Sequence, residues 1–78
     1  MIANPIPVGA RVLFKDSIAS GVGTVVSCDD DDSLGLNFLI YGVSVESGTE
    51  YLDHVGECRM TPDEVRDFYH KEIIEVLK

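Results

Sequence analysis

Residues 8–28 read VGARVLFKDSIASGVGTVVSC, and this stretch decides the fold. Within Arg11–Lys15, the apolar side chains of Val12 and Phe14 lie two residues apart, the period of a strand with one buried face. Gly23–Cys28 is rich in β-branched residues, which favour strands. The residues between these two segments have the composition of a loop. We therefore predict two strands joined by a loop.

The strand pattern continues beyond an acidic run. Residues 34–46 are long for one strand, and their apolar residues change parity near Ile40–Gly42, which predicts a bulge or a sharp bend there. Ser47 and Gly48 form a hairpin-turn signal. Two further short strands are then predicted, a returning strand over Glu50–Leu52 and a closing strand over Gly56–Met60.

The last eighteen residues carry helix signals. Thr61-Pro62-Asp63-Glu64 is typical of a helix start, with Thr61 as N-cap, Pro62 at the first helical position and Glu64 completing a capping box. The apolar residues that follow recur at helical spacing and would form one stripe: Val65, Phe68, Tyr69, Ile73, Val76 and Leu77. Asp67 and Lys71 would pair at i,i+4 on the opposite side. The pattern predicts an amphipathic helix over 61–78.

The 78 residues predict a single domain, because a chain of this length has no room for a second core. We expect an extended lead-in over 1–7, a small and strongly bent antiparallel β-barrel of four or five strands over 8–60, and the helix over 61–78 covering an open end. The predicted fold class is therefore α+β.

The segment Val8–Phe14, followed by the glycine-flanked segment Gly21–Val26, resembles the SH3-like barrels of the KOW and Tudor type. The resemblance covers about the first third of the chain. It implies an SH3-like barrel, and members of the KOW type usually bind RNA or ribosomal and transcription proteins through basic surfaces. This chain is acidic where those proteins are basic, so nucleic-acid binding does not carry over.

Negative charge is concentrated in the middle of the chain. No Lys or Arg occurs from Ser17 to Cys58. The eight carboxylates of this window contribute a charge of −8, which equals the net charge of the whole chain. A surface of one sign speeds and orients the encounter with a partner of opposite sign. We therefore predict a partner-binding surface made of Asp29, Asp30, Asp31, Asp32, Glu46, Glu50, Asp53 and Glu57.

The composition argues against several classes of function. Nucleic-acid affinity is supplied mostly by Lys and Arg, so direct binding of DNA or RNA is not expected. No apolar run approaches the roughly 20 residues that span a bilayer, and the N-terminus lacks a signal-peptide pattern. We expect a cytoplasmic protein that does not bind membranes. The sequence leaves its oligomeric state open.

The residues that could carry chemistry are scattered. Cys28, His54, Cys58 and His70 are the zinc-ligand candidates, but only His54 and Cys58 are close in sequence. We expect both cysteines to be buried thiols, His54 to lie in a turn, and His70 to lie on the helix surface. No calcium loop, phosphate loop or nucleophile motif occurs. We expect no cofactor, no metal and no enzymatic activity.

Two hypotheses of function follow. In the first, a small non-enzymatic protein docks its acidic surface on a basic partner protein, such as one that handles nucleic acid. In size and charge the chain is similar to small acidic phage-encoded inhibitors, the anti-CRISPR and anti-restriction proteins, which implies an inhibitor that acts as a DNA mimic. In the second, an SH3-like accessory module binds a peptide or subunit through an apolar groove, with Phe38, Tyr41 and Tyr51 as candidate anchors.

Overall fold

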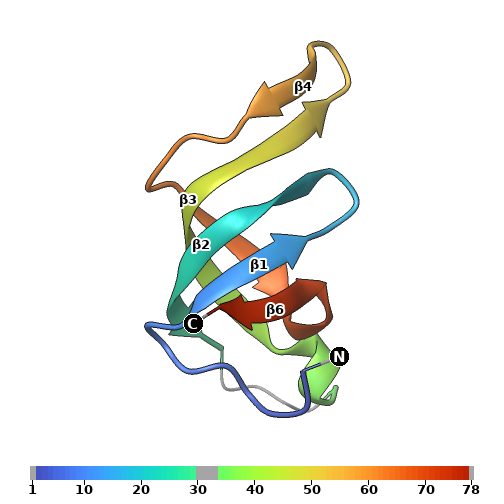
Figure 1. Ribbon diagram of the computed structural model, residues 1–78. Coiled ribbons are helices and arrows are strands. Elements are labelled where there is room, and N and C mark those ends of the chain that lie inside the picture. The colour runs from blue at the N-terminus through green and yellow to red at the C-terminus, as the bar shows by residue number, and fades with distance from the viewer. Residues whose placement is uncertain (1, 30–33, 78) are drawn as a thin grey trace.

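The computed structural model describes residues 2–29 and 34–77 (Figure 1). Its regular structure consists of strands and two single turns of 3-10 helix. In chain order these are β1 (Arg11–Lys15), β2 (Ala19–Cys28), η1 (Leu36–Phe38), β3 (Ile40–Leu52), β4 (Gly56–Arg59), β5 (Val65–Tyr69), η2 (His70–Glu72) and β6 (Ile73–Leu77). The fold class of the described residues is therefore all-β.

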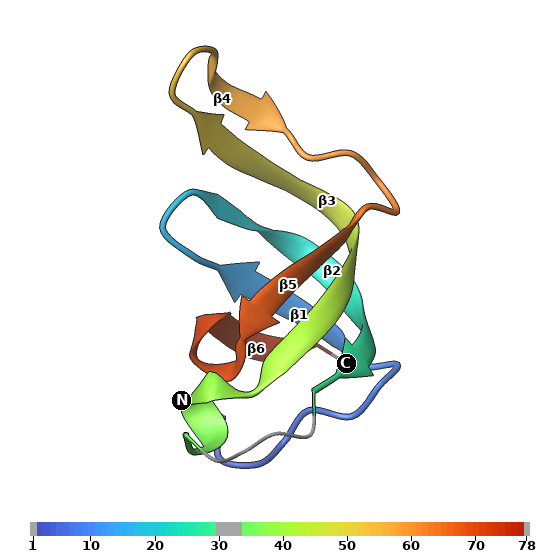
Figure 2. The same ribbon diagram turned by 180° about the vertical axis from the view of Figure 1, so that it is seen from behind.

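All strand pairs are antiparallel, and the strands form one sheet in the order β4-β3-β2-β1-β6. The long strand β3 pairs with β2 along one edge. Its other edge is shared by two partners, because β5 pairs with Ile40–Ser44 and β4 pairs with Thr49–Leu52. The last strand, β6, returns to pair with β1. In Figure 2, β5 lies in front of β2 and β1, while the β3–β4 hairpin projects away from the other strands.

The sheet bends because β2 and β3 each carry a bulge. Val26 is the extra residue of β2, and Glu46 is the extra residue of β3. Between the bulges and the hairpin, Gly21 pairs with Gly48. The two backbones approach so closely there that a Cβ atom on Gly48 would lie 2.7 Å from the Ser20 carbonyl oxygen. Two glycines are therefore required for this close crossing.

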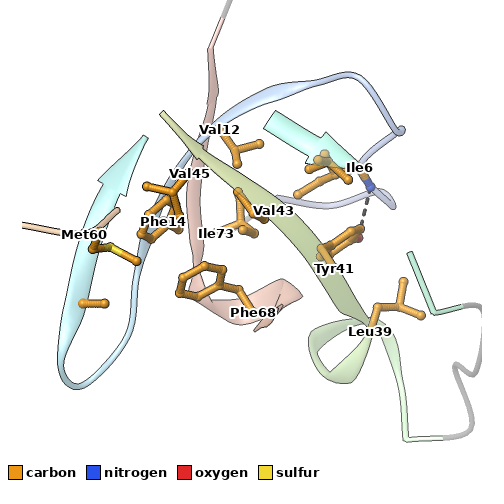
Figure 3. Close-up of a cluster of buried hydrophobic side chains, with 12 residues drawn as sticks. Ile6, Val12, Phe14, Leu39, Tyr41, Val43, Val45, Met60, Phe68 and Ile73 are labelled. Carbon is orange, nitrogen blue, oxygen red and sulfur yellow. Dashed lines mark hydrogen bonds between the residues drawn. The ribbon is translucent and has the colours of Figure 1, made fainter. Parts of the chain in front are cut away.

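The core side chains gather in one cluster (Figure 3). Phe14 of β1 stacks on Phe68 of β5, with ring centroids 4.3 Å apart. This contact joins the first hairpin to the C-terminal part of the chain. The buried apolar residues around it come from nearly every element: Ile6, Val12, Ala19, Val25, Leu39, Tyr41, Val43, Val45, Met60 and Ile73.

The predicted helix over 61–78 is wrong. Val65–Tyr69 is strand β5, residues 70–72 form the 3-10 turn η2, and Ile73–Leu77 is strand β6. The apolar residues that suggested a helical stripe are mostly β-branched or aromatic, which also suits strands. The backbone groups along the open edges of β1 and β3 favour strands over a helix. Strand β5 supplies hydrogen bonds to β3 and strand β6 supplies them to β1, which a single helix could not do.

The helix-start signal marks a β-turn instead. The Glu64 N–H donates to the Thr61 carbonyl at 3.3 Å, with Pro62 and Asp63 as the central residues. Asp63 has φ of +68°. Proline at the first central position and a positive φ at the second are typical of a type II turn. The same four residues therefore redirect the chain from β4 into β5.

The predicted small, strongly bent β-barrel over 8–60 is also wrong, because the antiparallel sheet does not close. Among the described residues β6 pairs only with β1, and β5 pairs only with β3. The predicted turn at Ser47 and Gly48 and the separate strand at Glu50–Leu52 are wrong as well, since both lie inside β3. Gly48 allows the backbones of β3 and β2 to approach closely, and the hairpin turn follows at residues 53–55. The strand over Arg11–Lys15 is confirmed with the predicted bounds.

The lead-in crosses one end of the core, where it is held by a buried polar network. Ile6 is buried, and its N–H donates to the Tyr41 hydroxyl at 3.1 Å. The Tyr41 oxygen lies 2.7 Å from His70 Nδ1, and His70 Nε2 lies 2.7 Å from the Ile2 carbonyl. His70 is 1% exposed, which corrects the prediction that it lies on a helix surface.

The partners fix the protons of this network. A carbonyl can only accept, so the proton of neutral His70 must be on Nε2, facing Ile2. Nδ1 then accepts from the Tyr41 hydroxyl, which itself accepts from the Ile6 N–H. Burial raises the pKa of Tyr41, so the hydroxyl keeps the proton that it donates.

We expect Gly48→Ala to destabilise the protein by about 1–3 kcal/mol, the range for overpacking a well-packed site. The added methyl group would meet Met60 Sδ and two backbone atoms of β2, so a strand must move. Urea denaturation measures the change. The exposed neighbouring change Ser47→Ala is the control and should stay within about 0.5 kcal/mol. Equal stability of the two variants would contradict the close crossing.

We expect Tyr41→Phe to cost about 1–3 kcal/mol, because it leaves the Ile6 N–H and His70 Nδ1 without a partner. Tyr51→Phe removes the same hydroxyl from an exposed side chain and should change the free energy of unfolding by less than about 0.5 kcal/mol. Denaturant unfolding of both variants checks this. A Tyr41→Phe protein as stable as the parent would show that the buried network does not hold the lead-in.

Candidate functional site

The eight carboxylates of the predicted surface do not form one cluster among the described residues. Asp30, Asp31 and Asp32 lie outside the described residues. Asp29 follows the end of β2 that pairs with Tyr41, whereas Glu50 lies opposite Ala19 at the other end of β2. Asp53 lies in the hairpin turn and Glu57 in β4. The sheet therefore separates Asp29 from the carboxylates of the hairpin.

Glu46 is held by a cation from outside the acidic window. Arg11 of β1 binds it through two contacts, Nε to Oε2 at 2.8 Å and Nη2 to Oε1 at 3.0 Å. The Arg11 hydrogen bond lowers the pKa of Glu46, and the same bond raises the pKa of Arg11. Both side chains are about half exposed, so this is a surface ion pair. The guanidinium therefore offsets the negative charge that Glu46 would otherwise present at the surface.

Glu50 is also paired. Arg66 of β5 contacts Glu50 Oε2 at 2.5 Å and Glu64 Oε1 at 2.9 Å through the same nitrogen. Hydrogen bonds to Glu64 and then to Glu50 raise the pKa of Arg66. The cluster carries two carboxylates and one guanidinium, so it keeps a net negative charge. The Glu50 side chain is only 17% exposed, which makes it a partly buried member of any docking surface.

The β3–β4 hairpin presents Tyr51 and Glu57 on one face. The two residues are direct cross-strand partners, and directly opposite residues of an antiparallel pair share a face. The Tyr51 N–H donates to the Ile18 carbonyl at 2.8 Å, which places the β1–β2 turn beside the hairpin. Tyr51 is 57% exposed and Ile18 is 48% exposed. An exposed aromatic residue therefore has an apolar neighbour on one side and a carboxylate on the other.

These residues line a hollow of about 350 Å³ between the β1–β2 turn and the hairpin. Three carboxylates line it against one cation, Lys15. The lining residues are Lys15, Asp16, Ser17, Ile18, Ala19, Ser20, Thr49, Glu50, Tyr51 and Glu57. An acidic hollow with an exposed aromatic ring can accept a basic side chain by charge and by ring contact.

Asp16 and Ile18 belong to this hollow but not to the predicted surface. Asp16 Oδ1 accepts from the N–H groups of Ile18 and Ala19 at 2.9 and 2.7 Å, forming an Asx turn. The turn presents Ile18 outward while Ala19 is buried. Aspartate at the start of a loop is a signal for such a turn. The sequence therefore indicated the local turn, but not that it lies beside Tyr51.

The three aromatic anchor candidates differ in their exposure. Tyr41 is fully buried in the core and is not available to a partner, which corrects that candidate. Phe38 is 41% exposed, but its ring packs edge-on against Tyr69, and Lys71 Nζ lies 4.9 Å from its centroid. The expected Asp67–Lys71 helix pair is therefore replaced by a contact between Lys71 and two rings. Tyr51, at 57% exposed, is the candidate with the most accessible side chain.

The zinc-ligand candidates are dispersed. Cys28 ends β2, Cys58 lies in β4, His54 lies in the hairpin turn as predicted, and His70 is buried in its network. Both cysteines are present as half-buried thiols. In the described ranges no group of three or more His, Cys, Asp or Glu side chains is placed to hold a metal ion. The same ranges contain no helix long and apolar enough to cross a bilayer.

We expect Arg11→Gln to raise the pKa of Glu46 toward the ordinary glutamate value, because the bidentate contact that lowers it is lost. A lowered folded-state pKa stabilises the protein above the unfolded-state pKa, and this stabilisation is lost as pH falls through the folded-state pKa. Carboxyl NMR titration measures the shift, with Lys15→Gln as the control. An unchanged Glu46 titration would contradict the ion pair.

The chain matches no protein-family model. It also matches no curated protein and no solved structure. The geometry of the described residues is therefore what carries any conclusion about function.

Proposed function

We propose that this protein is a small non-enzymatic binding module, acting in the cytoplasm, that docks on a basic surface of a partner protein. The contact surface is the acidic hollow between the β1–β2 turn and the β3–β4 hairpin. The observation that carries the proposal is the grouping of Asp16, Glu50 and Glu57 around exposed Tyr51 and Ile18. Aromatic side chains are typical binding hot spots, and surrounding carboxylates select a cationic partner.

The proposed surface is smaller than the full set of eight carboxylates. Arg11 cancels Glu46, and Asp29 lies at the other end of β2, so neither supports a contact at the hollow. The net charge of −8 still favours the approach of a basic partner from a distance. The role of the charge is therefore to guide the encounter, and Tyr51 provides the close contact. Proteins that handle nucleic acid are natural partners, because their phosphate-binding surfaces are rich in Lys and Arg.

One observation favours the second hypothesis, that of an accessory module that binds a peptide through apolar contacts. Tyr51, Leu52 and Val55 are all exposed on the hairpin, at 57%, 40% and 71%. A partner that used mainly these side chains would bind with little dependence on salt, because screening acts on charges. Salt dependence therefore separates the two hypotheses, whereas loss of Tyr51 weakens binding in both.

We expect an oligo-arginine peptide to shift the backbone NMR signals of residues 16–20 and 49–51, and its affinity to fall as salt rises from about 0.01 to 1 M. Asp16→Asn keeps the oxygen of the turn but removes the charge. It should weaken binding several-fold, and Tyr51→Ala by about tenfold or more. The control Asp67→Asn removes an exposed carboxylate from β5, away from the hollow.

The proposal fails if the peptide shifts signals all over the surface, or if Asp67→Asn weakens binding as much as Asp16→Asn does. Either result would mean that the peptide responds to net charge alone. Binding that is lost with Tyr51→Ala but is insensitive to salt would favour the accessory module.

A further inference from the structure

Strand β4 is an open edge of the sheet. It pairs with β3 along one side, and among the described strands no other pairs with its outer side. The hairpin projects from the rest of the molecule, and in both views no other strand runs along the outer side of β4 (Figures 1 and 2). An open edge presents unpaired N–H and C=O groups and is a template for pairing with another chain.

The hydrogen bonds of the hairpin show which backbone groups face outward. The Met60 N–H donates to the Gly48 carbonyl at 2.9 Å, which is a bond across the β3–β4 pair. In an antiparallel ladder the bonding direction alternates from residue to residue. Cys58, two residues before Met60, therefore directs its N–H and C=O toward β3. Glu57 and Arg59 direct theirs to the open side.

The side chains of this edge are complementary to themselves. Glu57 and Arg59 lie two residues apart in one strand, so both are on the same face. Both are exposed, and within the described chain neither takes part in an ion pair. A two-fold axis perpendicular to the sheet, midway between Cys58 of the two copies, would place Glu57 opposite Arg59 of the second copy and Arg59 opposite its Glu57. An edge with charges of one sign would instead repel its copy.

We propose that a second copy of this chain pairs with β4 edge to edge, antiparallel and centred on Cys58, so that one sheet continues through both copies. In this register Glu57 of one copy and Arg59 of the other form the hydrogen-bonded pairs, because their backbone groups face outward. The two Cys58 residues form a non-hydrogen-bonded pair, as the inward direction of their backbone groups requires. One register therefore satisfies three conditions. The outward-facing backbone groups can bond, Glu57 lies opposite Arg59, and the two copies are related by two-fold symmetry.

This register brings the two Cys58 residues close together. Opposed residues of a non-hydrogen-bonded pair have Cα atoms about 4.5 Å apart, which lies within the range of about 4.4–6.8 Å found for disulfides. Cys58 is a half-buried thiol on the hairpin. The cysteine is thus a reporter of the register. Other registers of the two edges would not place the two sulfurs opposite each other.

The contact is small, since β4 has four residues and stable interfaces bury about 1,200–2,000 Å². The dimer is therefore weak and depends on concentration. The inference does not rest on the proposed function, because the hollow is tested through Asp16 and Tyr51 whereas the dimer is tested through β4. Pairing would engage Glu57 with Arg59 of the second copy and leave Asp16 and Tyr51 open.

Oxidative cross-linking of a Cys28→Ser protein tests the register. Two Cys58 thiols lose their protons to solvent, and copper–phenanthroline takes the two electrons released as the S–S bond forms. We expect a cross-linked dimer on a non-reducing gel. Glu57→Arg and Arg59→Glu each place like charges opposite each other, and should lower the initial rate about tenfold, as loss of two cross-strand ion pairs implies.

Two complementary combinations sharpen the test. The double change Glu57→Arg with Arg59→Glu restores opposite charges within one sequence and should restore the rate. An equal mixture of the two single variants should also cross-link, because every position of one copy then meets the opposite charge on the other. Circular dichroism and thermal unfolding confirm that each variant is folded.

A second measurement needs no cysteine chemistry. In a Cys58→Ser protein, the amide hydrogens of Glu57 and Arg59 should exchange with solvent more slowly as protein concentration rises. The amide hydrogen of residue 58 is already directed at β3, so its exchange rate should not depend on protein concentration. Equal cross-linking rates for all charge variants, or exchange of Glu57 and Arg59 that is independent of concentration, would overturn the proposal.

Discussion

The pairing of β3 along both of its edges is the constraint on which the rest of the structure depends. This strand of thirteen residues pairs with β2 on one side and with β5 and β4 in succession on the other. Its inward side chains Tyr41, Val43 and Val45 are buried in the core. The bulges and the Gly21–Gly48 crossing bend it, so that its first half closes over the core and its second half extends into the hairpin.

The strands at the start of the chain could be predicted because their signals are local. Val12 and Phe14 alternate within Arg11–Lys15, and that strand was predicted with its exact bounds. The C-terminal segment shows the limit of local signals. Thr61-Pro62-Asp63-Glu64 satisfies the rules of a helix start and those of a type II turn. The apolar residues from Val65 to Leu77 have helical spacing, yet most are β-branched or aromatic and therefore also suit strands. The unpaired edges of β1 and β3 select the strands, and these edges exist only in the folded molecule.

The acidic window illustrates the same limit for the site. No Lys or Arg occurs between Ser17 and Cys58 in the sequence. In the folded molecule, however, this stretch does have cationic neighbours. In space, Arg11 reaches Glu46 and Arg66 reaches Glu50 from strands on either side of the window. Tyr51 was among the candidate anchors and is exposed, but Asp16 and Ile18 join it through a turn whose position no local pattern reveals.

The projecting hairpin and the core do not have to unfold together. No core residue lies in β4, and Met60, which follows it, is the first buried side chain after the hairpin turn. The strand can therefore detach and reform while Phe14, Phe68 and their neighbours stay packed. Such local opening costs less than global unfolding. The hairpin, which carries part of the proposed docking surface, can thus change its shape while the core stays folded.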